Sequence, residues 1–239
     1  AMIDYADDQL GQLLETLRRT GAADDTVVVV TSDHGDMLCG VDGLPIQSRM
    51  ASFAANGDLL HHVLVDSSKL TDVYIDWHTK GVYTIDAPDP GAPNIVNYYD
   101  KNLNPLGSFN TEYLDSFGTK GIKGSAFITA DTQGIVYVGG KGSGDNVVVA
   151  YQGPTSATEL GTNNSYNFLG ILHSDTNMQD IATDSLNNVY ISKPDRILKF
   201  AASSVDAQGK LVPGTFIGWM GRCDTNLTNT YACDTVNNR

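Results

Sequence analysis

The chain has 239 residues, of which 41% are hydrophobic and 18% are charged, a balance typical of a globular protein. Lys and Arg number 15 against 28 Asp and Glu, so the formal net charge is −13. Binding nucleic acid through its phosphates requires a basic surface, and the sequence has no run of about 18 apolar residues that could span a membrane. We therefore expect neither a nucleic-acid nor a membrane partner. The acidic excess either serves solubility or provides loops that hold a hard cation.

Residues 4–20 have the pattern of an amphipathic helix. Leu10, Leu13, Leu14 and Leu17 recur at helical spacing, and charged residues occupy the other faces. Gly21 follows directly and is well placed as the C-cap.

The β-branched run of residues 26–31 predicts a strand. Because it shows no alternation of polar and apolar residues, it is typical of a strand buried on both faces, as in a parallel α/β sheet. The run ends in residues 32–36, Ser-Asp-His-Gly-Asp. Ligand sites in α/β sheets lie at the carboxyl ends of strands, so we expect chemistry at this turn.

Residues 3–38 resemble the sulfatase branch of the alkaline phosphatase superfamily, in the style of choline-sulfatases. The resemblance rests on residues 5–11, the three leucines 13, 14 and 17, and residues 25–38. In that family an Asp-His pair after the strand ligates a metal, which implies that Asp33 and His34 are metal ligands. An Asp oxygen and a His nitrogen on one sharp turn can converge on a divalent cation, which we expect to be calcium or zinc.

Two features of the sulfatase family do not occur in this sequence. Sulfatases also use an upstream acidic pair and a Cys-x-Pro-x-Arg segment that supplies the nucleophile, and Cys39 is not followed by that pattern. Two ligands from one turn do not make a firm metal site. The alternative is that Asp33 and His34 lie at the end of an orphaned strand and meet only water.

One short phrase occurs three times further along the chain. It reads Gly-Val-Tyr-Thr-Ile at 81–85, Ile-Val-Tyr-Val-Gly at 135–139 and Asn-Val-Tyr-Ile-Ser at 188–192. An apolar run closing on aspartate (Asp76, Asp131 and Asp184) precedes each phrase, and two further apolar runs follow it. Four short strands per unit, at a period near fifty residues, are typical of a β-propeller blade.

We therefore expect two parts, a helix–strand segment in residues 1–50 and propeller blades in residues 51–239. Full units are predicted over about 70–121, 122–173 and 178–221, and the run at 59–65, which holds His61 and His62, is predicted to be an outer strand of an incomplete blade. Residues from about 55 to 239 resemble NHL-type six-bladed propeller repeats of large secreted bacterial proteins, and residues 184–191 and 196–200 carry the resemblance best. The predicted fold is mainly β, a partial β-propeller of three four-stranded blades that closes to six, or slightly more, as a homodimer. The join between the two parts is expected to be a natural fusion or a truncated or recombined reading frame.

Candidate site residues lie where the first strand of each unit begins. Asp72, Lys123 and Asp180 occupy equivalent positions there, with His78 and His173 nearby. Six-bladed propeller hydrolases, including calcium-dependent phosphotriesterases and lactonases, place metal ligands at such positions, and this likeness implies catalytic roles for Asp72, His78, Lys123 and Asp180. The alternative is that the acids cap turns and that the repeated aromatic residues (Tyr83, Tyr137, Tyr190 and Trp219) belong to the core.

Two functions are compatible with these features. One is a metal-dependent, promiscuous hydrolase of small phosphate or sulfate esters, in which a cation polarises the ester and activates water. The other is a non-catalytic secreted β-propeller module that binds a protein or a glycan through one face. We favour the hydrolase, because Asp33 and His34 form the one chemical motif in the sequence.

The cysteines bear on the compartment. Cys223 and Cys233 enclose nine residues without a metal-ligand pattern, so we expect a disulfide and hence an oxidising compartment. No signal peptide is visible at the N-terminus. We expect a secreted or extracellular bacterial parent protein.

Overall fold

The computed structural model describes residues 2–23, 26, 28–31, 48–54, 57–65, 70–87, 91–156, 159 and 166–221. Within these ranges the chain is mainly β, with one helix at its N-terminus, as the sequence predicts. No helix in them is long and apolar enough to cross a membrane. The expected disulfide between Cys223 and Cys233 lies outside the described residues.

The helix α1 (Met2–Thr20) confirms the amphipathic prediction for residues 4–20. Leu10, Leu14 and Leu17 are half-buried, whereas Leu13 is 50% exposed. Gly21 ends the helix in the left-handed region, at φ 72°, and its N–H donates to the carbonyl of Arg18. Glycine adopts this conformation without steric cost, which explains why the helix stops there.

The N-terminal sheet has the order β1-β2-β3, with β1 (Val28–Thr31), β2 (Ser48–Phe53) and β3 (Leu59–Val65). The expectation of a parallel α/β sheet around β1 is wrong for the described residues, because β1 pairs antiparallel to β2. A β-branched run favours a strand of either direction, so it could not have fixed the pairing. His61 and His62 lie on β3, His62 exposed and His61 half-buried.

Three four-stranded antiparallel sheets follow, which we call the first, second and third sheets. The first consists of β4 (Leu70–Asp76), β5 (Gly81–Asp86), β6 (Ile95–Tyr99) and β7 (Pro105–Asn110). The second consists of β10 (Lys123–Ala130), β11 (Ile135–Lys141), β12 (Asn146–Gln152) and β13 (Asn167–Asp175). The third consists of β14 (Asp180–Thr183), β15 (Val189–Ser192), β16 (Arg196–Phe200) and β19 (Phe216–Gly221). Each of the three predicted units thus corresponds to one four-stranded sheet, with its strands in chain order.

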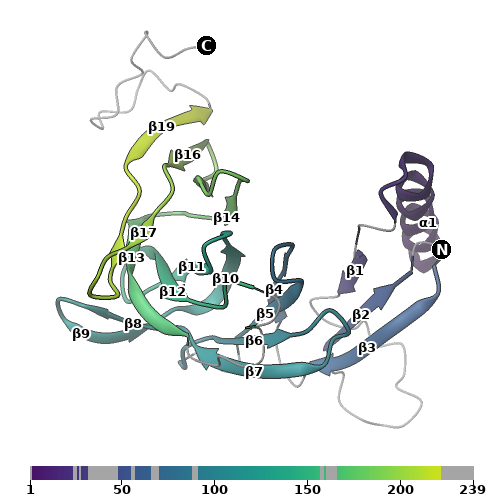
Figure 1. Cartoon of the computed structure of the whole chain (residues 1–239), viewed down its shortest axis with the longest axis horizontal. Helices are drawn as coiled ribbons and strands as arrows, with labels where there is room; N and C mark the ends of the chain where they lie inside the picture. The colour runs from purple at the N-terminus through teal and green to yellow at the C-terminus, as the bar shows by residue number, and fades with distance from the viewer. Residues whose placement is uncertain are drawn as a thin grey trace.

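The sheets follow one another along a curved array (Figure 1). The last strands, β3, β7, β13 and β19, lie along its outer side, while β4, β10 and β14 lie toward its inner side. This arrangement is compatible with part of a propeller, and closure into a ring stays a prediction.

Four hairpins share one turn, three in the four-stranded sheets and one in a small separate hairpin, residues 204–212. In each, an aspartate carboxylate accepts hydrogen bonds from the N–H groups two and four residues later, at 2.8 to 2.9 Å. The aspartates are Asp100, Asp131, Asp184 and Asp206, and the residues three positions later, Leu103, Gly134, Asn187 and Gly209, all have positive φ. A type I turn followed by a left-handed residue is a common three-residue hairpin connection. Two of the aspartates that close a repeated apolar run, Asp131 and Asp184, therefore fix turns.

Apolar side chains fill the space between successive sheets. Tyr83, Ile85 and Val96 of the first sheet pack against Ile128 and Val149 of the second. The other face of the second sheet packs in the same way on the third, through residues such as Tyr137, Val148, Ile191 and Phe200. Each fully buried side chain of this size contributes roughly 1.5–3 kcal/mol, so these interfaces dominate the stability of the array.

The N-terminal sheet packs on the first sheet. Met50 of β2 is fully buried against Leu70, Val82 and Tyr99, with Val63 of β3 alongside. This sheet and the three that follow therefore share one continuous series of apolar interfaces.

Two small hairpins were not predicted, β8 (Glu112–Asp115) with β9 (Gly118–Gly121), and β17 (Ser204–Val205) with β18 (Leu211–Val212). Phe117 at the tip of the first is 85% exposed.

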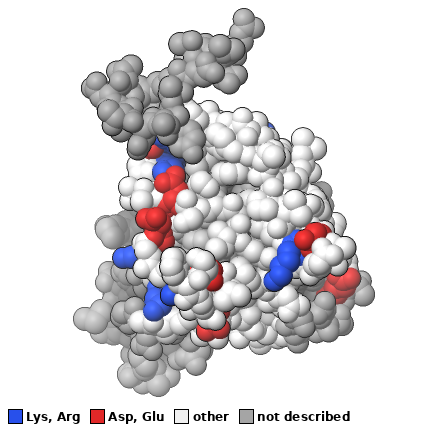
Figure 2. Space-filling view, turned by 90° about the vertical axis from the view of Figure 1, so that its left-hand side faces the viewer, with Lys and Arg blue, Asp and Glu red and all other residues white. Residues whose placement is uncertain are grey.

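On the face seen in Figure 2, basic side chains are interspersed with acidic ones rather than gathered into a patch.

Candidate functional site

The first strands of the three sheets lie side by side, with β10 between β4 and β14. Side chains, rather than a backbone ladder, join them. The Tyr74 hydroxyl donates to the carbonyl of Ala130 at 3.0 Å, and Thr183 Oγ1 donates to the same oxygen at 2.7 Å. The hydroxyls of Thr129 and Thr183 are 3.2 Å apart. The Asp72–Ile128 and Tyr74–Ala130 contacts both join residues 56 positions apart, and the Thr129–Thr183 and Thr132–Asn187 contacts join residues 54 and 55 positions apart. Neighbouring first strands therefore run in the same direction, so their first residues share one end of the array.

Asp72 is the predicted residue with the most unusual environment. Its Oδ1 accepts a hydrogen bond from the N–H of Val73, and its Oδ2 accepts one from the N–H of Ile128 on β10, both at 2.8 Å. Burial, with a smaller contribution from the negative charge of Asp180, raises the pKa of Asp72 to about 6, against the lowering effect of these hydrogen bonds. A carboxyl that titrates near 6 can exchange protons near neutral pH, as a general base must.

Asp180 and Lys123 are more exposed. Asp180 begins β14, and its Oδ1 accepts a hydrogen bond from the N–H of Ile181 at 2.8 Å. Lys123 begins β10 and lies opposite Lys141 on β11. The structure thus brings Asp72 within electrostatic range of Asp180 and leaves Lys123 exposed at the same end.

His78 lies in a different place. It follows β4, in the turn to β5, and is therefore at the opposite end of that strand from Asp72. Its Nε2 is 2.9 Å from the carbonyl oxygen of Thr155, and its ring meets Trp77 edge-on. The structure does not bring His78 together with the other three predicted residues. Its closeness to β4 in the sequence did not show at which end of the strand it lies.

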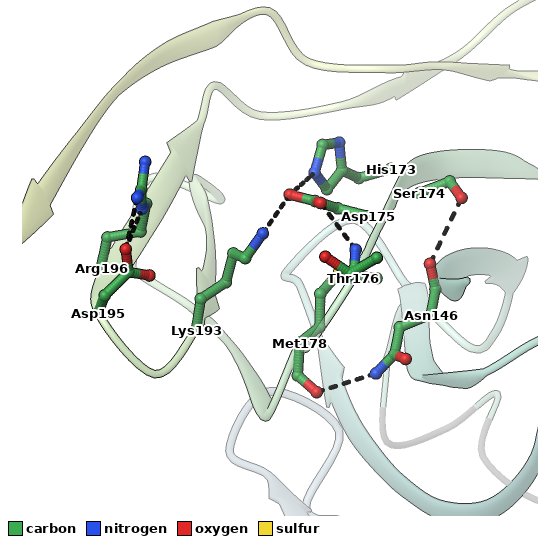
Figure 3. A network of polar contacts seen from close by, with 9 residues as sticks. All are labelled: Asn146, His173, Ser174, Asp175, Thr176, Met178, Lys193, Asp195 and Arg196. Atoms are coloured by element: carbon green, nitrogen blue, oxygen red, sulfur yellow. Dashed lines mark hydrogen bonds and ion pairs between the residues drawn. The ribbon is translucent and has the colours of Figure 1, made fainter. Parts of the chain in front are cut away.

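His173 belongs to a polar network that the sequence did not reveal in full (Figure 3). Its Nε2 lies 3.7 Å from Asp175 Oδ2, which also pairs with Lys193 in the turn between β15 and β16. Burial lowers the pKa of His173, and Lys193 adds to this while Asp175 opposes it. Burial alone would raise the pKa of Asp175, but the hydrogen bond and charge of Lys193 bring it below its usual value.

This network joins the second and third sheets. Asn146 of β12 donates to the carbonyl of Met178 at 3.0 Å, and Asp195 and Arg196 pair beside Lys193 (Figure 3). Asp175 and Lys193 belong to different sheets, so their pairing could be predicted only from the order in which the sheets pack. The polar groups of this network bind one another, which suits a structural link between the two sheets.

The repeated tyrosines also have structural partners. The hydroxyl of Tyr137 donates to Asp131 Oδ2 at 3.3 Å, and that of Tyr190 donates to Asp184 Oδ2 at 3.0 Å. Tyr83 and Tyr137 are fully buried, which confirms the core interpretation for them, whereas Tyr190 and Trp219 are only half-buried.

The predicted metal ligands Asp33 and His34 lie outside the described residues, as does Cys39. Within the described ranges, no group of three or more His, Cys, Asp or Glu is arranged to hold a metal ion.

Comparison with known proteins bears on the N-terminal part. The sulfatase family matches residues 1–60. Within the curated proteins, the choline-sulfatase of Rhizobium meliloti (strain 1021) is 53% identical over 38 residues. That segment is 16% of this chain and 7% of the choline-sulfatase, so the chain spans a small fraction of this relative. The predicted sulfatase resemblance of the N-terminal segment is confirmed, and the NHL-type resemblance of the sheets stays a prediction.

Proposed function

We propose that this chain acts as a hydrolase of small sulfate esters, with phosphate esters as a second, promiscuous class of substrate. The observation that supports the proposal is the sulfatase match over residues 1–60, which includes Asp33 and His34. We propose further that the parent protein is bacterial and extracellular, and that the chain works as a homodimer.

The proposed activity depends on a divalent cation, calcium or zinc, held in part by Asp33 and His34. One carboxylate oxygen and one imidazole nitrogen suit such an ion, but two donors leave its coordination incomplete, and the described residues add no cluster of ligands. The fit is therefore partial. When bound, a cation of this kind supplies Lewis-acid chemistry.

Asp72 is the described residue best suited to take a proton. Its pKa of about 6 leaves it largely ionised at neutral pH yet basic enough to accept a proton from water. Its two hydrogen bonds occupy one lone pair on each oxygen, so each oxygen keeps capacity for a further donor.

The proposal is tested with nitrophenyl sulfate and nitrophenyl phosphate, in the presence of Ca²⁺ or Zn²⁺ and after chelation. Asp33→Ala and His34→Ala should each lower kcat/KM by at least the roughly 10–100-fold that loss of an outer-shell partner of a metal costs. Asp145→Ala, which changes an exposed carboxyl of the β11–β12 turn, is the control and should leave the rate unchanged. Chelation should abolish hydrolysis, and either cation should restore it.

Full activity in both Asp33→Ala and His34→Ala would refute the assignment and direct attention to Asp72 and Asp180. Their alanine variants would then be the deciding pair.

A second candidate function is a non-catalytic binding module. It is favoured by exposed apolar side chains at the tips of hairpins, Trp77 at 54%, Phe117 at 85% and Leu186 at 75% exposed. Apolar side chains that gather on one surface are typical of contact sites, and Trp77 and Leu186 lie in equivalent turns of the first and third sheets. A wild-type chain that hydrolyses none of the esters with either cation would favour this function over the hydrolase.

A further inference from the structure

A row of positions repeats across the three four-stranded sheets in the register of their strands. It runs Tyr74-Tyr83-Tyr98-Gly107 in the first sheet, Thr129-Tyr137-Ala150-Gly170 in the second and Ala182-Tyr190-Lys199-Gly218 in the third. The next row on the same face lies two residues further along β5, β11 and β15. On the neighbouring strands β6, β12 and β16 this row holds Val96, Val148 and Ile197.

In the first two sheets these rows form an established interface. Tyr83 and Val96 are 0% exposed because the second sheet covers them. Tyr137 and Val148 are likewise 0% exposed, because the third sheet covers them. The same positions therefore bind an apolar sheet face twice within this chain.

In the third sheet the same rows are open. Ile197 is 36% exposed, and its neighbour Met220 on β19 is 54% exposed. A side chain added at Gly218 would meet no described atom within 4 Å, whereas at Gly170 it would lie 2.9 Å from Leu211. We call the surface of Tyr190, Ile197, Lys199, Gly218 and Met220 the open face.

The other end of the array offers a matching surface. Met50 and Val63 of the N-terminal sheet face the first sheet, so alternation places the next pair, Ala51 and His62, on its far face, and Leu60 lies beside His61 at a bulge of β3. Leu60 is 54% exposed and His62 is exposed. Each sheet of the array packs on the sheet that follows it. The far face of the N-terminal sheet is therefore the surface on which the third sheet of another copy would pack.

We infer that the open face binds the far face of the N-terminal sheet of a second copy of this chain. The contact continues the interface between successive sheets, and two copies related by a two-fold axis would make it twice and close a ring. Counting the N-terminal sheet, two copies bring eight sheets together, more than the six that the full units alone imply and within the range of about four to eight blades.

Lys199 is compatible with this contact. It replaces the buried Tyr98 and Ala150 of the earlier sheets, and its Nζ lies 5.1 Å from the centre of the Tyr190 ring. A lysine can lay its aliphatic stem along an apolar surface while its amino group reaches the rim.

Light scattering and sedimentation of the full chain test the inference at micromolar concentration. The wild type should have twice the 25.6 kDa mass of one chain. Ile197→Glu and Leu60→Glu should each give a monomer, because each places an unpaired charge in both contacts of the ring. Both side chains are exposed in one copy, so folding is retained, and Phe117→Glu on the β8–β9 hairpin is the control that stays dimeric.

Mixing the two variants gives the sharper result. A pair of one Ile197→Glu chain and one Leu60→Glu chain has one doubly altered contact and one wild-type contact. Mixing should therefore restore dimers that neither variant forms alone. A monomeric wild type, a dimeric Ile197→Glu protein or an open-ended series of larger species would each overturn the inference.

Discussion

At the scale of single residues, the environment shifts the pKa values of two aspartates of the sheets, Asp184 and Asp72, in opposite directions. Asp184 accepts four hydrogen bonds, from Leu186, Asn188 and Tyr190, and these outweigh desolvation and lower its pKa to about 2. Asp72 accepts only two and is more deeply buried, so its pKa is raised to about 6. The donors to Asp184 lie within six residues of it along the chain, whereas one of the two donors to Asp72, the N–H of Ile128, belongs to the neighbouring sheet.

This difference predicts the pH dependence of Asp72. Its pKa rises from 3.8 in the unfolded chain to about 6, so the folded chain binds the proton more tightly. Stability from this group is therefore complete below about pH 4 and is lost as the pH rises through 6. One pKa unit corresponds to about 1.4 kcal/mol, so the partly exposed Asp72 should lower the free energy of unfolding by about 2 kcal/mol between pH 4 and pH 7.

Urea unfolding of the wild type and of Asp72→Asn over this range checks the prediction. Asparagine leaves one N–H without its acceptor, which lowers stability equally at every pH, so the slope is the informative quantity. Asp145→Asn changes an exposed carboxyl of the β11–β12 turn and should keep the wild-type slope. A constant difference between the wild type and Asp72→Asn across the range would contradict the assignment.

At the scale of elements, the hairpin turn is the unit that repeats most faithfully. The residue types within the turn vary, but the residue three positions after the aspartate always adopts positive φ. Glycine and asparagine tolerate this conformation, whereas Leu103 adopts it at φ 62° because its side chain is buried beside Met50 and Tyr99. Packing therefore overrides local preference at that position.

The turns of Gly134 and Gly209 give a matched pair for a second prediction. A Cβ at Gly134 would lie 2.8 Å from the carbonyl oxygen of Pro154, whereas one at Gly209 would meet no described atom within 4 Å. Gly209→Ala should lower the free energy of unfolding only by the strain of a left-handed alanine, about 1–2 kcal/mol. Gly134→Ala adds a backbone clash and should cost about 3 kcal/mol or more in total.

Chemical denaturation of both variants measures the difference. Equal destabilisation would show that the loop around Pro154 moves aside freely and that crowding plays no part.

The strands themselves were largely predictable, for a physical reason. Each repeated apolar run lies in a strand, because apolar β-forming residues and turn-forming aspartates act locally. The β8–β9 hairpin was missed because residues 112–121 carry little apolar periodicity. The antiparallel pairing of β1, the position of His78 and the partnership of Asp175 with Lys193 depend on contacts between distant segments, which no local pattern specifies.

At the scale of the whole molecule, the sulfatase-like segment is joined to the array by structure as well as by sequence. Every residue of β1 pairs with β2, and β2 places Met50 in the interface with the first sheet. The helix and β1, residues 2–31, could not bury both faces of a strand alone, since chains below about 40 residues seldom fold unaided. It is stabilised instead by the sheet that it extends.

Removing this segment should therefore destabilise the array. A chain that begins at Ser52 loses β1, most of β2 and the Met50 side chain, and it exposes Leu70, Val82 and Tyr99 to water. We expect it to unfold at a lower temperature or to aggregate. Met50→Ala in the full chain removes the buried side chain alone and should cost about 2–5 kcal/mol.

Thermal unfolding of the three proteins compares these effects. A chain beginning at Ser52 that melts at the wild-type temperature would refute the docking of the N-terminal sheet.

The succession of hairpins between chain neighbours also sets the order in which the protein can be made. Nascent chains leave the ribosome at about 5–20 residues per second, whereas a hairpin forms in about 1–10 μs. Each sheet is complete within its own stretch of chain, so it can assemble long before the next stretch is synthesised. Each finished sheet then presents an apolar face on which the following one condenses. Folding is therefore expected to advance vectorially from β4 toward β19, and the last face to form is the one left exposed to meet another chain.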